Sequence, residues 1–270
     1  MSFAGFAVSK QGISHIERSI VCQDASRFCK IQNNKGETYA ISAIADGVGS
    51  CTYSDIGSKY VVDCAVSRVS YYLSTANQDV LTCIRCAFSD TLEQFRAYSE
   101  EREIPMNSMA TTLTLSVYDG STVYYGHSGD GGIIVLNDDY SYQMITHRHK
   151  GEWANSVIPF SSVLAWEFGS STNVVSFLSC TDGFLDFVVD SEVHNCRVLF
   201  PQIKPALTTH IPSDAIAETI AEEWSEYLDT SHIRDAITDD ISIVVVVSEQ
   251  IKDIDTQNIV FDANKWEEEL

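Results

Sequence analysis

Three aspartates stand at the ends of apolar runs that have the composition of β-strands. Asp46 and Asp182 each follow such a run and are themselves followed by glycine, and Asp239 comes just before another. A glycine next to a strand end lets backbone carbonyls come close to whatever the carboxylate holds. Because strand ends can converge at one mouth between sheets, we expect these three carboxylates to meet there.

Carboxylates gathered in this way are suited to hard cations such as Mg²⁺ and Mn²⁺, which take oxygen ligands. The Gly47 carbonyl, Asp24 and Asp130 are further candidate donors. Two such ions about 3.5–4 Å apart can share a water molecule, lower its pKa and clamp a phosphoryl oxygen. A single Asp-Gly is weak evidence, since this dipeptide is common in turns, so the prediction depends on the ordered set.

Composition narrows the classes of function. Of the 270 residues, 44% are hydrophobic, which is enough for a sizeable core. The formal net charge is -21, from 38 acidic and 17 basic residues. Nucleic-acid binding needs a basic face, so we expect no nucleic acid partner. The acidity fits a protein that collects carboxylates for cations, although most of it serves solubility.

Features of membrane or exported proteins are not evident. The longest apolar runs are strand-sized, and the first residues lack a basic stretch followed by a long apolar core. The 8 cysteines are scattered, and Cys83–Cys86 is the one C-x-x-C pair, in a helix-like region. We therefore expect reduced thiols, a cytoplasmic location and no membrane partner.

Changes in periodicity divide the chain into elements. Strands are expected at 1–10, 26–31 and 39–45, and two long helices follow, the second over 79–102. From Thr111 the pattern predicts an antiparallel meander with strands at 111–118, 122–127, 133–136 and 140–145. Later segments are predicted as irregular (147–172), strand (174–180), short helix (184–189), loop (201–212), helix (213–228), strand (241–247) and polar tail (248–270).

Six motifs in one order then point to a family. The motifs cover roughly residues 12 to 247 and are Gln23-Asp24, Ile44–Gly49, Ala110–Thr112, Ser128–Asp130, Cys180–Asp186 and Asp239–Val244. Together they resemble the metal-dependent protein phosphatases of the protein phosphatase 2C (PPM) family, and the segment 151–155 is similar to its bacterial-type members. No Gly-x-Ser-x-Gly elbow, Walker motif or dinucleotide fingerprint competes with them.

The resemblance implies an α+β fold, a four-layer α-β-β-α sandwich with two central antiparallel sheets flanked by helices. It implies a catalytic domain over 1–248, with 249–270 as an acidic tail or peripheral segment. It also implies two or three Mg²⁺ or Mn²⁺ ions. The roles it assigns are Asp46 as the ligand that bridges two ions, Asp182 and Asp239 at the first ion, Gly47 and (through water) Asp24 at the second, Asp130 and Asp186 at the third, and Asp240 beside the ligands.

The activity implied is hydrolysis of phosphoserine and phosphothreonine in proteins by a metal-bridged hydroxide, with Asp46, Asp182 and Asp239 activating the water. Such an enzyme acts on a phosphorylated protein and commonly works opposite a Ser/Thr kinase. Gln23 stands where eukaryotic members have Glu, and Val48 where some have His. These departures keep open a catalytically impaired pseudophosphatase that acts as a signalling or binding module.

The residue that binds phosphate or donates a proton stays open at this point. His15 could contact phosphate or be structural, and Arg18 lies near the first motif at a different spacing from the eukaryotic one. His147 and Arg148 belong to a basic cluster that could steer the substrate or form a solvated loop.

Overall fold

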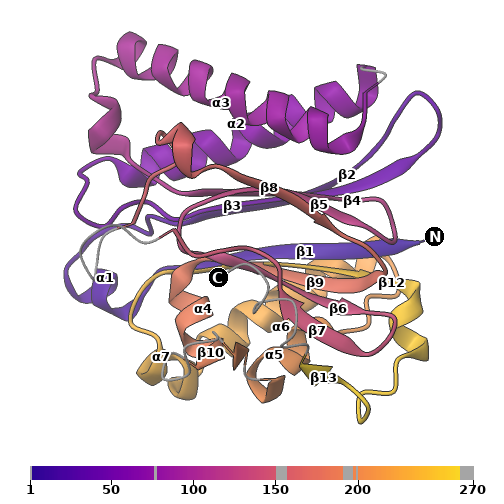
Figure 1. The fold of residues 1–270 in the computed structure, drawn as a ribbon. Helices are drawn as coiled ribbons and strands as arrows, with labels where there is room; N and C mark the ends of the chain where they lie inside the picture. The colour runs from indigo at the N-terminus through magenta and orange to yellow at the C-terminus, as the bar shows by residue number, and fades with distance from the viewer. Residues whose placement is uncertain (1, 76–77, 150–156, 191–196, 199, 262–270) are drawn as a thin grey trace.

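Two β-sheets lie face to face at the centre of the molecule (Figure 1). The computed structural model describes residues 2–75, 78–149, 157–190, 197–198 and 200–261. The first sheet has five antiparallel strands in the order β2 (Ala25–Gln32), β3 (Thr38–Ala45), β4 (Leu113–Tyr118), β5 (Val123–Ser128) and β8 (Glu167–Ser171). The second has six in the order β1 (Phe3–Lys10), β12 (Ile241–Ser248), β9 (Val174–Cys180), β6 (Gly132–Asn137), β7 (Ser141–Met144) and β13 (Val260–Phe261), antiparallel except for the β7–β13 pair.

Helices cover the outer face of each sheet (Figure 1). The long helices α2 (Ser54–Thr75) and α3 (Val80–Arg102) lie over the five-stranded sheet, and α4 (Asp182–Val188), α5 (Phe200–Leu207) and α6 (Asp214–Leu228) lie under the six-stranded sheet. Smaller elements are α1 (Ile13–Glu17), α7 (Ser231–Ala236) and the pair β10 (Val189–Asp190) and β11 (Arg197–Val198). The predicted four-layer sandwich is therefore confirmed.

Three apolar layers hold the four structural layers together. The middle one lies between the sheets and includes the buried side chains of Phe3, Ile44, Tyr118, Phe177 and Val246. The outer two lie between each sheet and its helices. Each fully buried aromatic or aliphatic side chain contributes about 1.5–3 kcal/mol relative to its exposed state, so the layers fix how the strand ends meet.

Local sequence explains where α3 and the β2–β3 hairpin begin and end. The Asp79 carboxylate accepts a 2.9 Å hydrogen bond from the Thr82 amide at the start of α3. In the hairpin, Asn33 Oδ1 accepts from the amides of Lys35 and Glu37, each at 2.9 Å. Gly36 there has φ +81, which glycine adopts without strain. Both the helix and the turn match the sequence predictions.

The single predicted meander is wrong. β4 and β5 pair in the five-stranded sheet, but β6 and β7 belong to the other sheet. The chain crosses between sheets after β5, where Gly129 has φ +135 and an added Cβ would lie 2.5 Å from Thr112 Cβ. The glycines around Asp130 permit this crossing, which periodicity alone does not distinguish from a hairpin.

Three more segments differ from prediction. Residues 201–212 were expected to be a loop, yet most of α5 lies there, with Pro205 inside it, because Ile203, Ala206 and Leu207 are fully buried. The polar strand β8 lies in the stretch expected to be irregular. In the polar tail, β13 adds an edge strand beside β7.

Two other expectations concern membranes and thiols. Within the described residues, no helix combines the length and apolar character needed to cross a bilayer. The seven described cysteines are free, and Cys83 and Cys86 lie on α3, the helix predicted for this pair.

Candidate metal centre

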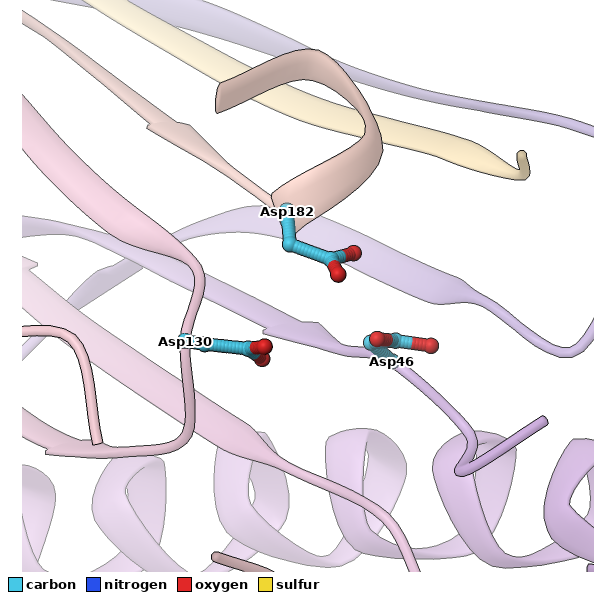
Figure 2. A group of neighbouring side chains, drawn as sticks. All are labelled: Asp46, Asp130 and Asp182. Atoms are coloured by element: carbon cyan, nitrogen blue, oxygen red, sulfur yellow. The ribbon is translucent and has the colours of Figure 1, made fainter. Parts of the chain in front are cut away.

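Three carboxylates from three different segments converge at one end of the sandwich. Figure 2 shows Asp46 just after β3, Asp130 in the crossing between β5 and β6, and Asp182 at the first turn of α4. One carboxylate oxygen from each residue lies within 4.8 Å of the others. The sequence predicted that Asp46, Asp182 and Asp239 would meet. The group observed is Asp46, Asp182 and Asp130, which was predicted as a further donor, and Asp239 is not part of it.

The backbone of Asp46 is fixed by two threonines that precede β4. The Asp46 carbonyl accepts 2.8 Å hydrogen bonds from the Thr112 amide and from Thr111 Oγ1. The Asp46 amide donates a 2.8 Å bond to Thr112 Oγ1. The aspartate is thus held at a strand end by side chains as well as by the sheet, which leaves its own carboxylate to face the cluster.

Asp24 is buried beside the same cluster. Its Oδ2 accepts a 2.7 Å hydrogen bond from Thr181 Oγ1, which in turn accepts a 3.0 Å bond from the Ser242 amide. Burial raises the pKa of Asp24 well above its usual value, and nearby Asp240 and Asp182 raise it further.

Asp239 and Asp240 differ in burial: the first side chain is exposed and the second is buried. The Asp239 side chain is 62% exposed, and its charge contributes to raising the pKa of Asp46 and Asp182. The Asp240 carboxylate is buried and accepts 2.6 Å hydrogen bonds from the amides of Gly12 and Gln23. Asp240 therefore ties the segment between β1 and β2 to the start of β12.

Two glycines allow the close approach of the Asp239–Asp240 backbone. A Cβ on Gly12 would lie 2.3 Å from the Asp239 carbonyl carbon, and one on Gly183 would lie 2.1 Å from the Asp240 carbonyl oxygen. Neither distance is possible for a real side chain, so both positions require glycine. The two contacts bring α4 and the segment after β1 against the same strand end.

The carboxylates repel one another. Burial is the largest cause that raises the pKa of Asp46 well above its usual value, and Asp24, Asp182, Asp130 and Asp239 each raise it further. The pKa of Asp182 is also raised, first by burial and then by Asp239 and Asp186, while Arg148 lowers it. A divalent cation would relieve this repulsion.

Arg148 lies at the edge of the cluster rather than in solvent. Its Nε donates a 2.9 Å hydrogen bond to the Asp130 carbonyl, and its Nη1 lies 2.6 Å from Asp186 Oδ1 on α4. The Arg148 side chain is 13% exposed, whereas that of Asp186 is 60% exposed. Asp186 on α4 is therefore paired with a guanidinium from the segment that follows β7.

The remaining candidates lie at different distances from the carboxylates. His15 is buried, with Nδ1 2.9 Å from Asp240 Oδ2, which matches its structural alternative. The side chain of Gln23 donates a 3.4 Å hydrogen bond from Nε2 to the Cys51 carbonyl. Arg18 bonds back to Ser14, and His147 pairs with Glu167. Residues 151–155, expected to match bacterial-type members, lie outside the described part of the chain.

The donor set fits hard divalent ions. All the converging side chains offer carboxylate oxygens, and no sulfur or imidazole is among the three that lie within 4.8 Å of one another. Mg²⁺ and Mn²⁺ favour such oxygen ligands. Asp46, Asp130 and Asp182 would hold the ions, with Asp239 and Asp24 next to them.

Two positioning residues were not anticipated as such. His127 is fully buried, and its Nδ1 lies 2.8 Å from Thr114 Oγ1 while Nε2 lies 3.1 Å from the Gly129 carbonyl and 2.9 Å from the His147 carbonyl. Thr181 links Asp24 to β12. Only the position of Thr181 next to Asp182 could have indicated its role from sequence.

Comparison with known proteins gives one family. A family model described as Protein phosphatase 2C matches residues 11–235. No curated protein matches the sequence significantly.

Solved structures with a similar fold include three structures of two serine/threonine phosphatases, Stp1 and PstP. Serine/threonine phosphatase Stp1 from Staphylococcus aureus has 15% identity and a TM-score of 0.63, covering 92% of this chain and 96% of that chain. Mycobacterium tuberculosis serine/threonine phosphatase PstP/Ppp has 19% identity and a TM-score of 0.62, covering 92% and 100%. The catalytic domain of PstP in complex with 2 manganese ions has 18% identity and a TM-score of 0.61, covering 91% and 97%.

Proposed function

Because the chain belongs to the protein phosphatase 2C family, and is a protein phosphatase by that membership, we propose that it is a metal-dependent serine/threonine phosphatase. The observation that carries the proposal is the convergence of Asp46, Asp130 and Asp182, whose oxygens lie within 4.8 Å of one another. Bound Mg²⁺ or Mn²⁺ would supply a water of lowered pKa and offset charge on the phosphoryl oxygens.

The chain's own residues would divide the work. Asp46 would contact two ions, since its carboxylate is grouped with Asp130 and Asp182, Asp24 also acts on its pKa, and its backbone is held by Thr111 and Thr112. Asp182 and Asp239 would complete one ion's ligands. The Gly47 carbonyl, with Asp24 through water, would serve the other. The 2 manganese ions of the PstP complex support two ions as the working number.

Substrate and setting follow from the same proposal. The substrate is a phosphorylated protein, and the opposing enzyme is a Ser/Thr kinase in a cytoplasmic signalling pathway. We assign catalysis to residues 1–248 and regard 249–270 as a peripheral segment.

The test compares wild type with Asp46→Asn in hydrolysis of p-nitrophenyl phosphate and a phosphothreonine peptide, with Mn²⁺, Mg²⁺ or EDTA. We expect metal-dependent turnover that EDTA abolishes and that Asp46→Asn lowers by about 10²-fold or more, the scale of losing a group that stabilises charge in the transition state. The matched control is Asp63→Asn, which removes a 66% exposed carboxylate on α2 and leaves turnover unchanged.

A second candidate function is a pseudophosphatase that binds phosphoproteins. It is favoured by the Gln23 side chain, which is neutral and donates to the Cys51 carbonyl. Wild-type turnover no higher than that of Asp46→Asn, together with retained binding of the phosphothreonine peptide, would support this function and reject the enzyme.

A further inference from the structure

The guanidinium of Arg148 is fixed at the edge of the carboxylate cluster by both of its ends. Nε donates to the Asp130 carbonyl at 2.9 Å, and Nη1 lies 2.6 Å from Asp186 Oδ1. The guanidinium therefore links two segments, the β5–β6 crossing and helix α4. The Arg148 side chain is 13% exposed and so is largely removed from solvent, whereas its partner Asp186 is 60% exposed.

The backbone around Arg148 is also held. The carbonyl of His147 lies 2.9 Å from His127 Nε2, and the His149 amide donates a 2.7 Å hydrogen bond to the Gly129 carbonyl. These contacts attach the residues on both sides of Arg148 to the turn that carries Asp130. The backbone that carries the guanidinium is thus held by the buried crossing, and the Asp186 carboxylate on α4 supplies its second contact.

This position conflicts with a third divalent ion. The resemblance to the family implies Asp130 and Asp186 as ligands of such an ion, which would need oxygens at about 2.0–2.1 Å if it were Mg²⁺. An ion that contacts both segments would lie beside a guanidinium that already contacts both. Two cations beside the same carboxylate repel each other. The Asp186 oxygen that lies 2.6 Å from Nη1 is already paired with the guanidinium.

We propose that Arg148 takes the place of a third metal ion, so that this chain holds two divalent ions and Asp186 is the partner of an arginine instead of a metal ligand. The proposal rests on the proposed function, because it presumes the two-ion site. It extends that function by giving the site a permanent cation that is independent of the metal supply. Asp130 then serves the centre through its carboxylate and holds Arg148 through its carbonyl.

In the experiment, the protein is first freed of metal and then titrated with Mn²⁺. Equilibrium dialysis and the electron paramagnetic resonance signal of free Mn²⁺ give the number of ions bound per chain. Wild type is expected to bind two. Asp186→Asn is expected to bind two with unchanged affinity, because Asp186 binds no ion. Arg148→Gln is expected to bind a third ion about tenfold or more tightly than wild type does, since a like charge has been removed, and the double variant returns to two.

The matched control is the exposed ion pair of Arg27 and Asp63, at the surface of β2 and α2. Arg27→Gln and Asp63→Asn are expected to leave the ion count at two, and circular dichroism verifies that each variant is folded. Should Arg148→Gln fail to fold, Asp186→Asn alone decides the proposal.

The outcomes separate the two proposals. A wild-type count of three, or a loss of one ion in Asp186→Asn, overturns the role of Arg148 and leaves the phosphatase function standing. A folded Arg148→Gln that gains no affinity for a third ion also overturns it. A wild-type count of zero overturns the metal-dependent function itself.

Discussion

At the residue scale, single hydroxyl groups position the acidic residues of the candidate metal centre. Thr181 Oγ1 donates to the buried Asp24 carboxylate and accepts from the Ser242 amide, so one side chain satisfies two buried polar groups. Loss of this hydroxyl would leave both without a partner, and a buried polar group without a partner is more costly than the bond was favourable.

Thr181→Val keeps the side-chain shape and removes the hydroxyl. We expect the free energy of unfolding to fall by about 1–3 kcal/mol, measured by urea denaturation of the metal-free protein. The control is Thr208→Val, because the Thr208 hydroxyl bonds the Lys204 carbonyl near the surface; its effect should stay within about 0.5 kcal/mol. Equal effects of the two substitutions would contradict the role of Thr181.

The sequence indicates the acidic residues of the centre but not their surroundings. Asp46 and Asp182 are recognisable from strand ends followed by glycine, and their convergence is observed. The contact of Arg148 with Asp186 joins residues 38 positions apart through the packing of α4 against the crossing. The burial of His15 beside Asp240 likewise depends on β1 and β12 being neighbours. No local pattern encodes either contact.

At the element scale, the crossing between β5 and β6 is the segment that brings Asp130 to the centre. Gly129 permits it, with φ +135 and no room for a Cβ against Thr112. Thr112 also bonds the backbone of Asp46, so a shift of Thr112 would move the Asp46 and Asp130 carboxylates together.

Gly129→Ala is therefore expected to lower the free energy of unfolding by at least about 2 kcal/mol, through backbone strain and overlap, and to weaken Mn²⁺ binding. Thermal unfolding with and without Mn²⁺ measures both. The control, Gly36→Ala, introduces a comparable backbone cost at φ +81 where nothing lies within 4 Å of the new Cβ. Only the Gly129 variant should lose metal-dependent stabilisation, and an equal loss in both would count against the crossing's role.

Elements in which apolar residues recur at a clear helical or strand spacing were predictable, and the exceptions have physical causes. The helix over 79–102 begins beside its Asp79 cap and buries one apolar face, so its local signals agree with its packing. α5 was missed because its prolines favour a loop, whereas burial of Ile203 and Leu207 outweighs the hydrogen bond that Pro205 cannot donate. The strand β8 is polar, and pairing with β5 defines it.

At the scale of the whole molecule, buried His127 makes stability depend on pH. Burial is the main cause that lowers its pKa from 6.5 to about 3 in the folded chain. Between these pH values the unfolded chain binds the proton and the folded chain does not. The contribution of His127 to stability is therefore present above pH 6.5 and is lost as the pH falls toward 3.

We expect the free energy of unfolding to fall by up to about 1.4 kcal/mol per pH unit from this residue over that interval. His127→Gln should be less stable at pH 7, since the contacts with Thr114 and with the Gly129 and His147 carbonyls are altered. Between pH 6.5 and about 3, however, its free energy of unfolding should change less with pH than that of wild type. Denaturant unfolding at several pH values measures the slope. A variant with the wild-type slope would show that another group is responsible.

The pairing of β1 with β12 has a consequence for synthesis. These strands lie side by side, although Phe3 and its partner Ser248 are 245 positions apart. Asp240 bonds Gly12 and Gln23 only when the last core strand is present. On the ribosome, the first strand must wait for nearly the whole chain to emerge, and such distant pairing is slow. The closing of the six-stranded sheet, and with it the two hydrogen bonds that Asp240 accepts, would therefore come late in synthesis.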